Sequence, residues 1–222
     1  MGETATMSAD GVLETILDTG IVAIVRSDSA KGLIDTVRAL AAGGVRAIEV
    51  TMTTPGALEA ISADAAECGE DFTIGAGSVR GAAAAERAID AGAEFLVMPV
   101  VSLDAIRVAK QRGKVACPGA LTPTEAATAW EAGGDVIKIF PASFFGPAYI
   151  KALRAPMPEI RYMPVGGVRL DSIGEYIAAG ACAFGVGGSL ANSRTIAAGD
   201  WSGIARNAEQ FVAAVRRARS GE

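Results

Sequence analysis

Two ionisable residues in apolar segments are the strongest candidates for chemistry. Lys138 lies within the run 136–140 and Glu49 within the run 47–52. Burying an ammonium group is costly, so a buried lysine loses its proton more easily. A neutral amine in a pocket is a nucleophile that forms a Schiff base with a ketone. The alternative for Lys138 is a lysine at a strand end, whose stem lies on apolar surface while its head reaches water.

Side-chain alternation along the two runs predicts where these groups point. Successive side chains of a strand lie on opposite faces. Glu49 shares its face with Ala47 and Thr51, whereas the larger apolar side chains of 47–52 share the other face. Because the larger side chains should contact helices, we expect Glu49 to point into the interior. If Lys138 also points inward, the two groups meet in one cavity and supply what imine chemistry needs. A buried ion pair that only fixes strand register is the alternative.

Glycine pairs late in the chain are candidates for a phosphate site. Glycine lets backbone N–H groups approach an anion, and a serine hydroxyl adds a donor. Single pairs are common in turns, so the prediction depends on two pairs following successive late strands. Arg26, at the end of the first expected strand, could hold a carboxylate or phosphate, or could be a solvated charge. The candidate phosphate ligands are Gly166, Gly167, Gly187, Gly188 and Ser189.

A chain that alternates short apolar segments with alanine-rich helical segments positions these residues. Glycines close several of the helices, and 122–125 (Thr-Pro-Thr-Glu) is typical of a capping box at a helix start. The glycine-rich segment 73–78 is typical of a strand that packs close to a neighbour. The expected strands are 21–26, 47–52, 73–79, 95–100, 115–119, 136–140, 161–165 and 183–186. The expected helices are 8–18, 30–42, 55–68, 82–91, 103–112, 123–132, 147–153, 171–179 and 201–219.

This alternation predicts an α/β protein with a (β/α)8 TIM barrel and an N-terminal leading helix. We expect one domain over 1–222, with 1–7 poorly ordered. The alternative is an open doubly wound sheet, which usually places a glycine-rich phosphate turn after its first strand. Here that strand is followed by 26–28 (Arg-Ser-Asp), and the glycine pairs come late. Barrels often bind phosphate with the loops after their last two strands, so the late pairs favour the barrel.

Composition excludes several functions. The net charge of −5 argues against binding nucleic acid or an acidic membrane, and no apolar run is long enough to span a bilayer. An N-terminus without an apolar core and an odd number of cysteines favour a cytoplasmic protein. The absence of histidine excludes a Ser-His-Asp triad, a Cys-His pair and the usual zinc sites. A magnesium site made only of carboxylates stays open.

Taken together, these motifs resemble the class I 2-keto-3-deoxy-6-phosphogluconate aldolases, the KDPG/KHG aldolase family, over about 21–190. The resemblance implies a (β/α)8 barrel assembled as a homotrimer, a small-molecule substrate, no cofactor and no metal. It implies that Lys138 forms the Schiff base and that Glu49 shuttles protons through water, while the glycine pairs with Ser189 hold the phosphate. The segments that carry the resemblance are 42–51, 74–79, 117–119, 137–142, 164–168 and 185–189. Positions near the substrate in this resemblance are Arg26, Thr53, Ser78, Pro99 and Phe140.

Three positions depart from the family pattern. Thr53 stands where many members have a substrate-binding arginine, so carboxylate recognition would fall to Arg26 and Ser78. Val165 replaces a threonine before the first late glycine pair, as in relatives that act on the galactonate epimer. Ser78 replaces a more usual threonine but keeps the hydroxyl. These departures concern the C4 epimer and leave the chemical step unchanged.

The leading prediction is a cytoplasmic class I aldolase that reversibly cleaves 2-keto-3-deoxy-6-phosphogluconate to pyruvate and glyceraldehyde 3-phosphate. Within the same mechanism, the substrate could be the galactonate epimer or 4-hydroxy-2-oxoglutarate. A glycine-lined phosphate site favours a phosphorylated acid. An alternative of another class is a barrel that binds a phosphorylated sugar acid without turning it over.

Overall fold

The computed structural model describes residues 7–67 and 72–221, and every expected strand is present there in a shorter form. The expected strand 115–119 is split in two at Pro118, because proline has no N–H to donate. The expected poor ordering of 1–7 lies outside the described residues except at Met7, which packs against buried residues. The strands are β1 (Ile21–Val25), β2 (Ala47–Thr51), β3 (Thr73–Gly77), β4 (Phe95–Val97), β5 (Val115–Cys117), β6 (Gly119–Ala120), β7 (Ile137–Ile139), β8 (Tyr162–Pro164) and β9 (Phe184–Val186).

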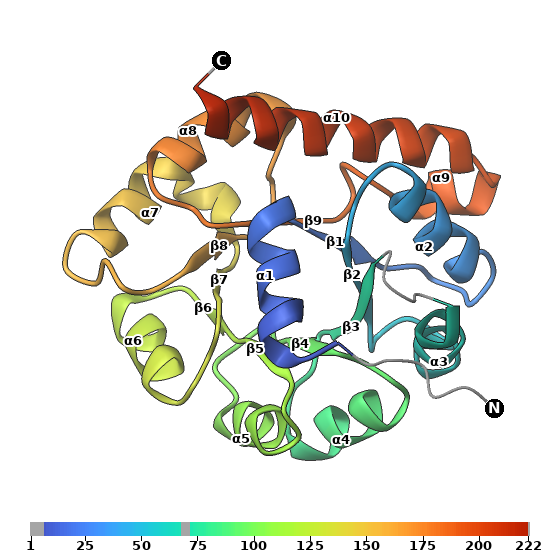
Figure 1. Ribbon diagram of the computed structural model, residues 1–222, viewed down its shortest axis with the longest axis horizontal. Helices are drawn as coiled ribbons and strands as arrows, with labels where there is room; N and C mark the ends of the chain where they lie inside the picture. Colours follow the sequence, from blue (N-terminus) through green and yellow to red (C-terminus); the bar gives the residue numbers. More distant parts are fainter. Residues whose placement is uncertain (1–6, 68–71, 222) are drawn as a thin grey trace.

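The helices between the strands also follow the expected order (Figure 1). The 3-10 turn η1 (Ala142–Phe144) and the short helix α9 (Ser193–Ala198) were not expected, and η2 (Leu170–Ser172) precedes the eighth helix. The expected capping box is confirmed, since Thr122 Oγ1 accepts from Glu125 N and Glu125 Oε2 accepts from Thr122 N. The helices are α1 (Ala9–Thr19), α2 (Leu33–Ala42), α3 (Ala57–Glu67), α4 (Ala82–Asp90), α5 (Leu103–Gln111), α6 (Pro123–Glu131), α7 (Gly146–Arg154), α8 (Ile173–Ala178) and α10 (Trp201–Ser220).

The strands pair in parallel, which confirms the α/β class. Six of them form one curled sheet in the order β5-β4-β3-β2-β1-β9, which is half of a barrel. The other three form a second sheet in the order β6-β7-β8. An isolated bridge between Val165 and Gly185 connects the end of β8 to β9. Helices surround the strands in Figure 1. The pairs within each sheet and the Val165–Gly185 bridge between the sheets are all parallel, so the carboxyl ends of the strands face the same side of the molecule.

The leading helix α1 lies across the centre of the ring of helices in Figure 1. Ser8 caps it by accepting from Gly11 N, and Gly20, with φ 68°, ends it in the left-handed region that suits glycine. Its buried residues Val12 and Ile16 pack with Val22, Ala47, Val115, Val136 and Ala183, which stand at or near the amino-terminal ends of their strands. The helix thereby covers the amino-terminal end of the sheet and leaves the carboxyl ends for a site.

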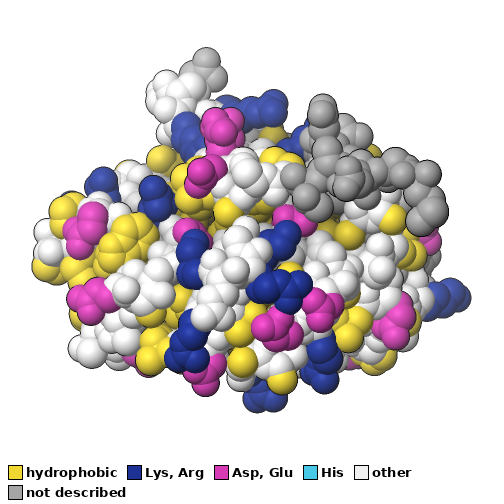
Figure 2. Space-filling model, turned by 60° about the horizontal axis from the view of Figure 1, so that its bottom comes forward, with side chains coloured by type: hydrophobic (Ala, Val, Ile, Leu, Met, Phe, Trp, Pro, Cys, Tyr) yellow, Lys and Arg dark blue, Asp and Glu magenta, His cyan; other side chains and the backbone are white. Residues whose placement is uncertain are grey.

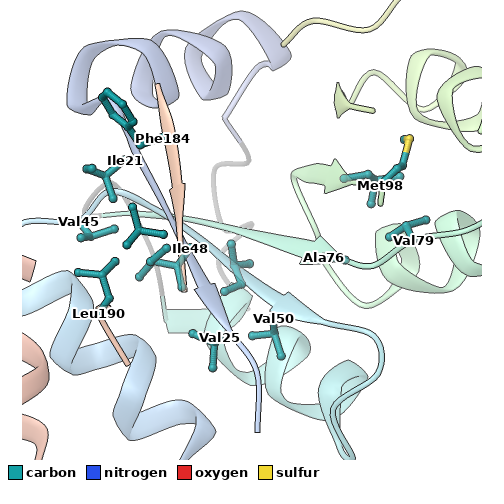
Figure 3. Packing of buried hydrophobic residues seen from close by; sticks show 14 of the residues in the cluster. Ile21, Val25, Val45, Ile48, Val50, Ala76, Val79, Met98, Phe184 and Leu190 are labelled. Atoms are coloured by element: carbon teal, nitrogen blue, oxygen red, sulfur yellow. The ribbon is translucent and has the colours of Figure 1, made fainter. Parts of the chain in front are cut away.

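Buried residues form two clusters that correspond to the two faces of the strands. Figure 3 shows part of the larger cluster, in which Ile48 and Val50 of β2 lie beside Val25 of β1. That cluster also contains the buried residues of the surrounding helices, such as Leu40 of α2. Ala47 belongs instead to the interior cluster beneath α1. The larger side chains of β2 therefore face the helices, and alternating residues face the interior, as expected.

The outer surface carries charges of both signs. Figure 2 turns forward the side on which α4 and α5 lie, and basic and acidic side chains are interspersed there. Arg112, for example, joins Glu86 and Asp90 in ion pairs between these helices. No helix within 7–67 and 72–221 combines the length and apolar character needed to cross a bilayer.

Candidate active site

Lys138 and Glu49 both lie on the interior face of the strands. Lys138, in the middle of β7, is 6% exposed, and Glu49, in the middle of β2, is 1% exposed. Val136, which shares the Lys138 face, belongs to the interior cluster, as does Ala47 on the Glu49 face. The expected inward orientation of both groups is confirmed. The alternative of an ordinary strand-end lysine, whose head lies in water, does not fit a residue that is only 6% exposed.

Burial shifts both groups toward their neutral forms. It raises the pKa of Glu49 from 4.5 to about 7, although the nearby charges of Lys138 and Arg26 lower it. Burial also lowers the pKa of Lys138, against the attraction of Glu49, and Arg26 lowers it further. Glu49 Oε2 has no hydrogen-bond partner among the described atoms. The amine is therefore easier to deprotonate than an ordinary lysine, and the carboxyl group titrates near neutral pH, where it can both accept and donate a proton.

Two neighbours complete the surroundings of the amine. Lys138 Nζ lies 5.0 Å from the centroid of the ring of Phe140, a residue that is 41% exposed. Cys117 belongs to the same interior cluster, and burial raises the pKa of its thiol well above the ordinary value. The thiol therefore stays protonated and is a packing group rather than a second nucleophile.

Gly77 makes room for the Glu49 carboxylate. β2 and β3 pair so that Thr51 lies opposite Gly77 and Glu49 opposite Gly75. A Cβ atom at Gly77 would lie 2.6 Å from Glu49 Oε1, which is too close for any real contact. Sequence reasoning predicted close packing along 73–78 but not its partner. The signal in the sequence was the pair Gly75 and Gly77, which are two residues apart and therefore lie on the same face of β3, the face that meets Glu49.

Replacing Gly77 with alanine is expected to slow catalysis by at least about tenfold and to destabilise the fold by roughly 1–3 kcal/mol, because the added methyl group displaces the carboxylate. Gly174→Ala is the matched control, since a Cβ atom there meets nothing within 4 Å. Steady-state rates and thermal melts of both variants measure the difference. Equal rates for Gly77→Ala and wild type would show that the position of Glu49 does not limit turnover.

A pocket of about 370 Å³ lies at the carboxyl ends of β8 and β9. Gly166 and Gly167 have φ values of 91° and 75°, which only glycine adopts readily. Within the described chain, the backbone N–H groups of Gly167, Gly188 and Ser189 donate no hydrogen bond. Ser189 Oγ donates to Val168 O at 3.2 Å, so the hydroxyl must rotate before it can donate to a ligand. The lining includes these expected phosphate ligands together with Gly187, Arg26 and Phe140.

A second pocket, of about 770 Å³, lies over the ends of β2, β3 and β4 and contains Thr53 and Ser78. Arg26 Nη2 donates to Ser78 Oγ at 3.3 Å, which connects the two pockets. Ser78 has φ 60°, an unusual conformation for a residue with a side chain and one that often marks a functional site. Pro99 lines neither pocket, and its backbone packs against Gly119, where a Cβ atom would lie 2.5 Å from Pro99 C.

The structure therefore gathers most of the expected site residues at the carboxyl ends of the strands. Lys138 and Glu49 lie in the interior, and neither lines the two pockets. Phe140 links the amine to the first pocket, and Gly77, next to Ser78, links the carboxylate to the second. Within 7–67 and 72–221, no group of three or more Cys, Asp or Glu side chains is arranged to hold a metal ion.

Comparisons with known proteins show the family of the chain. Residues 12–207 match the family described as KDPG and KHG aldolase. A 2-dehydro-3-deoxy-6-phosphogalactonate aldolase of Escherichia coli (strain K12) is 35% identical over 200 residues, 90% of this chain and 94% of that protein. A 2-dehydro-3-deoxy-phosphogluconate aldolase of Treponema pallidum (strain Nichols) is 33% identical over 202 residues, 90% of this chain and 96% of that protein.

Solved structures give the same result. A native KDPGal structure has a TM-score of 0.85 and 34% identity, with 90% of this chain and 96% of that chain covered. A cube-shaped protein cage, designed by fusing symmetric oligomeric domains, has a TM-score of 0.86 and 34% identity, with 91% of this chain and 74% of that chain covered. The fold and these likenesses define the protein as an aldolase, an enzyme of the lyase class. The chain belongs to the KDPG and KHG aldolase family.

Proposed function

We propose that the protein is a Schiff-base aldolase that reversibly cleaves 2-keto-3-deoxy-6-phosphogluconate to pyruvate and glyceraldehyde 3-phosphate. The observation that carries the proposal is the buried Lys138 amine, whose pKa burial lowers, in one interior with the Glu49 carboxylate. A group of free backbone N–H donors at Gly167 and Gly188 lies in the adjoining pocket and suits a phosphate.

The chemistry needs only these groups and water. Neutral Lys138 Nζ attacks the C2 carbonyl, and Glu49 supplies the proton with which the C2 oxygen leaves as water. The resulting iminium accepts the electron pair of the C3–C4 bond when the C4 hydroxyl is deprotonated, so the bond breaks and glyceraldehyde 3-phosphate leaves. The remaining enamine takes a proton at C3, and water then hydrolyses the iminium to release pyruvate and regenerate Lys138. Proton transfers run through Glu49 and bound water.

The galactonate epimer is a second candidate substrate. Val165 lines the phosphate pocket and packs on β9, where a Cβ atom at Gly185 would lie 2.5 Å from Val165 Cγ2. The Escherichia coli relative is named for the galactonate acid and the Treponema pallidum relative for the gluconate acid. The two substrates differ only at C4, so both use the same Lys138 and Glu49 chemistry.

A phosphorylated acid is expected to be the preferred substrate. Free N–H donors at Gly167, Gly188 and Ser189 favour a phosphate, which 4-hydroxy-2-oxoglutarate lacks. Charge-assisted hydrogen bonds contribute roughly 1.5–3 kcal/mol each, so we expect kcat/KM to be at least about tenfold higher on the phosphorylated acid. Parallel assays on both C4 epimers and on 4-hydroxy-2-oxoglutarate measure the preference. A clear preference for the unphosphorylated acid would overturn this ranking.

We also infer a single domain over 1–222 in which the two sheets close into one eight-stranded (β/α)8 barrel. Two contacts support closure. Lys138 N, in β7, donates at 2.9 Å to the carbonyl oxygen of Pro118, the residue between β5 and β6. The Val165–Gly185 bridge joins the end of β8 to β9. A homotrimer is supported by exposed Phe144, by its neighbour Phe145 and by the designed cage of symmetric oligomeric domains. Sedimentation of the purified protein measures its assembly.

A cytoplasmic location is supported by the two described cysteines, which are both free thiols. Fractionation of cells that express the protein at its natural level tests the location. The protein should appear with the soluble fraction that also contains reduced glutathione, and recovery in an exported or membrane fraction would contradict it.

A further inference from the structure

The second pocket carries positive charge that the mechanism has not used. Arg80 and Arg87 line it beside Thr53 and Ser78, and no acidic residue does so. Within the described chain, neither arginine donates a side-chain hydrogen bond or joins an ion pair. Arg80 follows Ser78 by two residues in the loop after β3, whereas Arg87 lies farther along, on α4. Two unpaired guanidinium groups in one pocket attract an anion.

The proposed substrate has two anionic ends, a C1 carboxylate and a phosphate, and the structure has two pockets at the carboxyl ends of the strands. The trigonal C2 atom bonded to Lys138 carries C1 on one side and C3 on the other. If the chain from C3 to the phosphate extends into the pocket of Gly167 and Gly188, the C1 carboxylate points away from that pocket. The second pocket adjoins the reactive pair on the Glu49 side: a Cβ atom at Gly77 would lie 2.6 Å from Glu49 Oε1, and Ser78, the next residue, lines that pocket.

We propose that Arg80 binds the C1 carboxylate of the keto acid and is a specificity-determining residue for 2-keto acids. The inference rests on the Schiff-base function proposed above. Thr53 and Ser78 offer only neutral hydroxyl groups in this pocket, and Arg26 lines the phosphate pocket while donating to Ser78. Arg80 is the nearest cation in sequence to Ser78, and its fork of N–H donors matches a carboxylate with two parallel hydrogen bonds.

The test compares Arg80→Ala with wild type in the aldol-addition direction, with pyruvate and with its uncharged amide as nucleophile. Losing a charge-assisted pair is expected to raise the KM for pyruvate roughly 10- to 100-fold. The KM for glyceraldehyde 3-phosphate and the trapping of pyruvamide by borohydride should change little. Arg80→Lys keeps the charge but not the forked pair of N–H donors, so its KM for pyruvate should lie between those of wild type and Arg80→Ala. Arg107→Ala, which removes an exposed arginine on α5, is the matched control and should behave as wild type.

Two results would overturn the role of Arg80. One is an unchanged KM for pyruvate in Arg80→Ala, and the other is an equal loss with pyruvate and pyruvamide, which would indicate a structural effect without charge recognition. The failure of the underlying function is distinguishable, because wild-type protein would then form no adduct with pyruvate at all. An active wild type with an Arg80→Ala variant of normal pyruvate affinity refutes only the role of Arg80.

Discussion

Replacing Lys138 with alanine is expected to abolish aldol cleavage and to prevent any covalent adduct with pyruvate. Burial lowers the pKa of the Lys138 amine and so makes it a better nucleophile, whereas burial raises the pKa of the Cys117 thiol and keeps it protonated. Removing it leaves no group to form the iminium, and without that electron sink the C3–C4 bond is not activated.

The direct measurement is borohydride trapping. Wild-type protein is incubated with pyruvate, reduced and digested, and peptide mass spectrometry locates the adduct, which should lie on the peptide that contains Lys138. Lys151→Ala, which removes an exposed lysine on α7, is the matched control and should keep both adduct and activity. Because alanine leaves a cavity in the buried interior, Lys138→Met, which keeps most of the side-chain volume, is a second inactive variant.

Each outcome of the trapping experiment has a defined meaning. Cleavage by a folded Lys138→Met variant would refute the Schiff-base assignment, as would an adduct mapped to another lysine. No adduct in folded wild-type protein would favour a barrel that binds phosphorylated sugar acids without turning them over. Circular dichroism melts of every variant separate a loss of chemistry from a loss of fold.

The orientation of the reactive pair could be predicted from the sequence because it depends only on local periodicity. Large apolar residues alternate with Glu49 in β2 and with Lys138 in β7, and the hydrophobic effect turns the larger face toward the helices. Helix ends were predictable for a similar reason, since a capping residue or a left-handed glycine acts within one turn. The succession of strands and helices along the chain was predictable from the regular alternation of apolar and alanine-rich segments.

Features that depend on contacts distant in the sequence could not be predicted in this way. The fit of Gly77 against Glu49 is set by the pairing of β2 with β3, and the Arg26–Ser78 hydrogen bond joins residues 52 positions apart. The hydrogen bond from Ser189 to Val168 depends on how two loops pack together. The break at Pro118 is predictable from the sequence, because proline has no N–H to donate, and the single strand expected over 115–119 was wrong at this position.

Replacing Glu49 with glutamine is expected to slow turnover by on the order of 10²–10⁴, because the amide cannot exchange protons with the substrate. The same change should remove a feature of the pH profile. Burial raises the pKa of Glu49 to about 7, so the wild-type pH profile of kcat/KM should show an inflection near that pH, where this group changes protonation state. The Glu49→Gln variant should lack this inflection. Asp104→Asn, at an exposed ion pair on α5, is the matched control. A rate within a few-fold of wild type would remove Glu49 from the mechanism.

The substitution should also change stability in a pH-dependent direction. Between pH 4.5 and about 7, folded protein keeps a proton on Glu49 that the unfolded chain releases, so the free energy of unfolding falls as pH rises through this window. A shift of this size corresponds to on the order of 3 kcal/mol. Glutamine carries no such proton, so Glu49→Gln should gain stability over wild type between pH 5 and pH 8. Denaturant unfolding at both pH values measures the gain. If the difference in the free energy of unfolding between Glu49→Gln and wild type were the same at pH 5 and at pH 8, burial would not raise the pKa of Glu49. That result would also remove the reason that this carboxyl group can exchange protons at neutral pH.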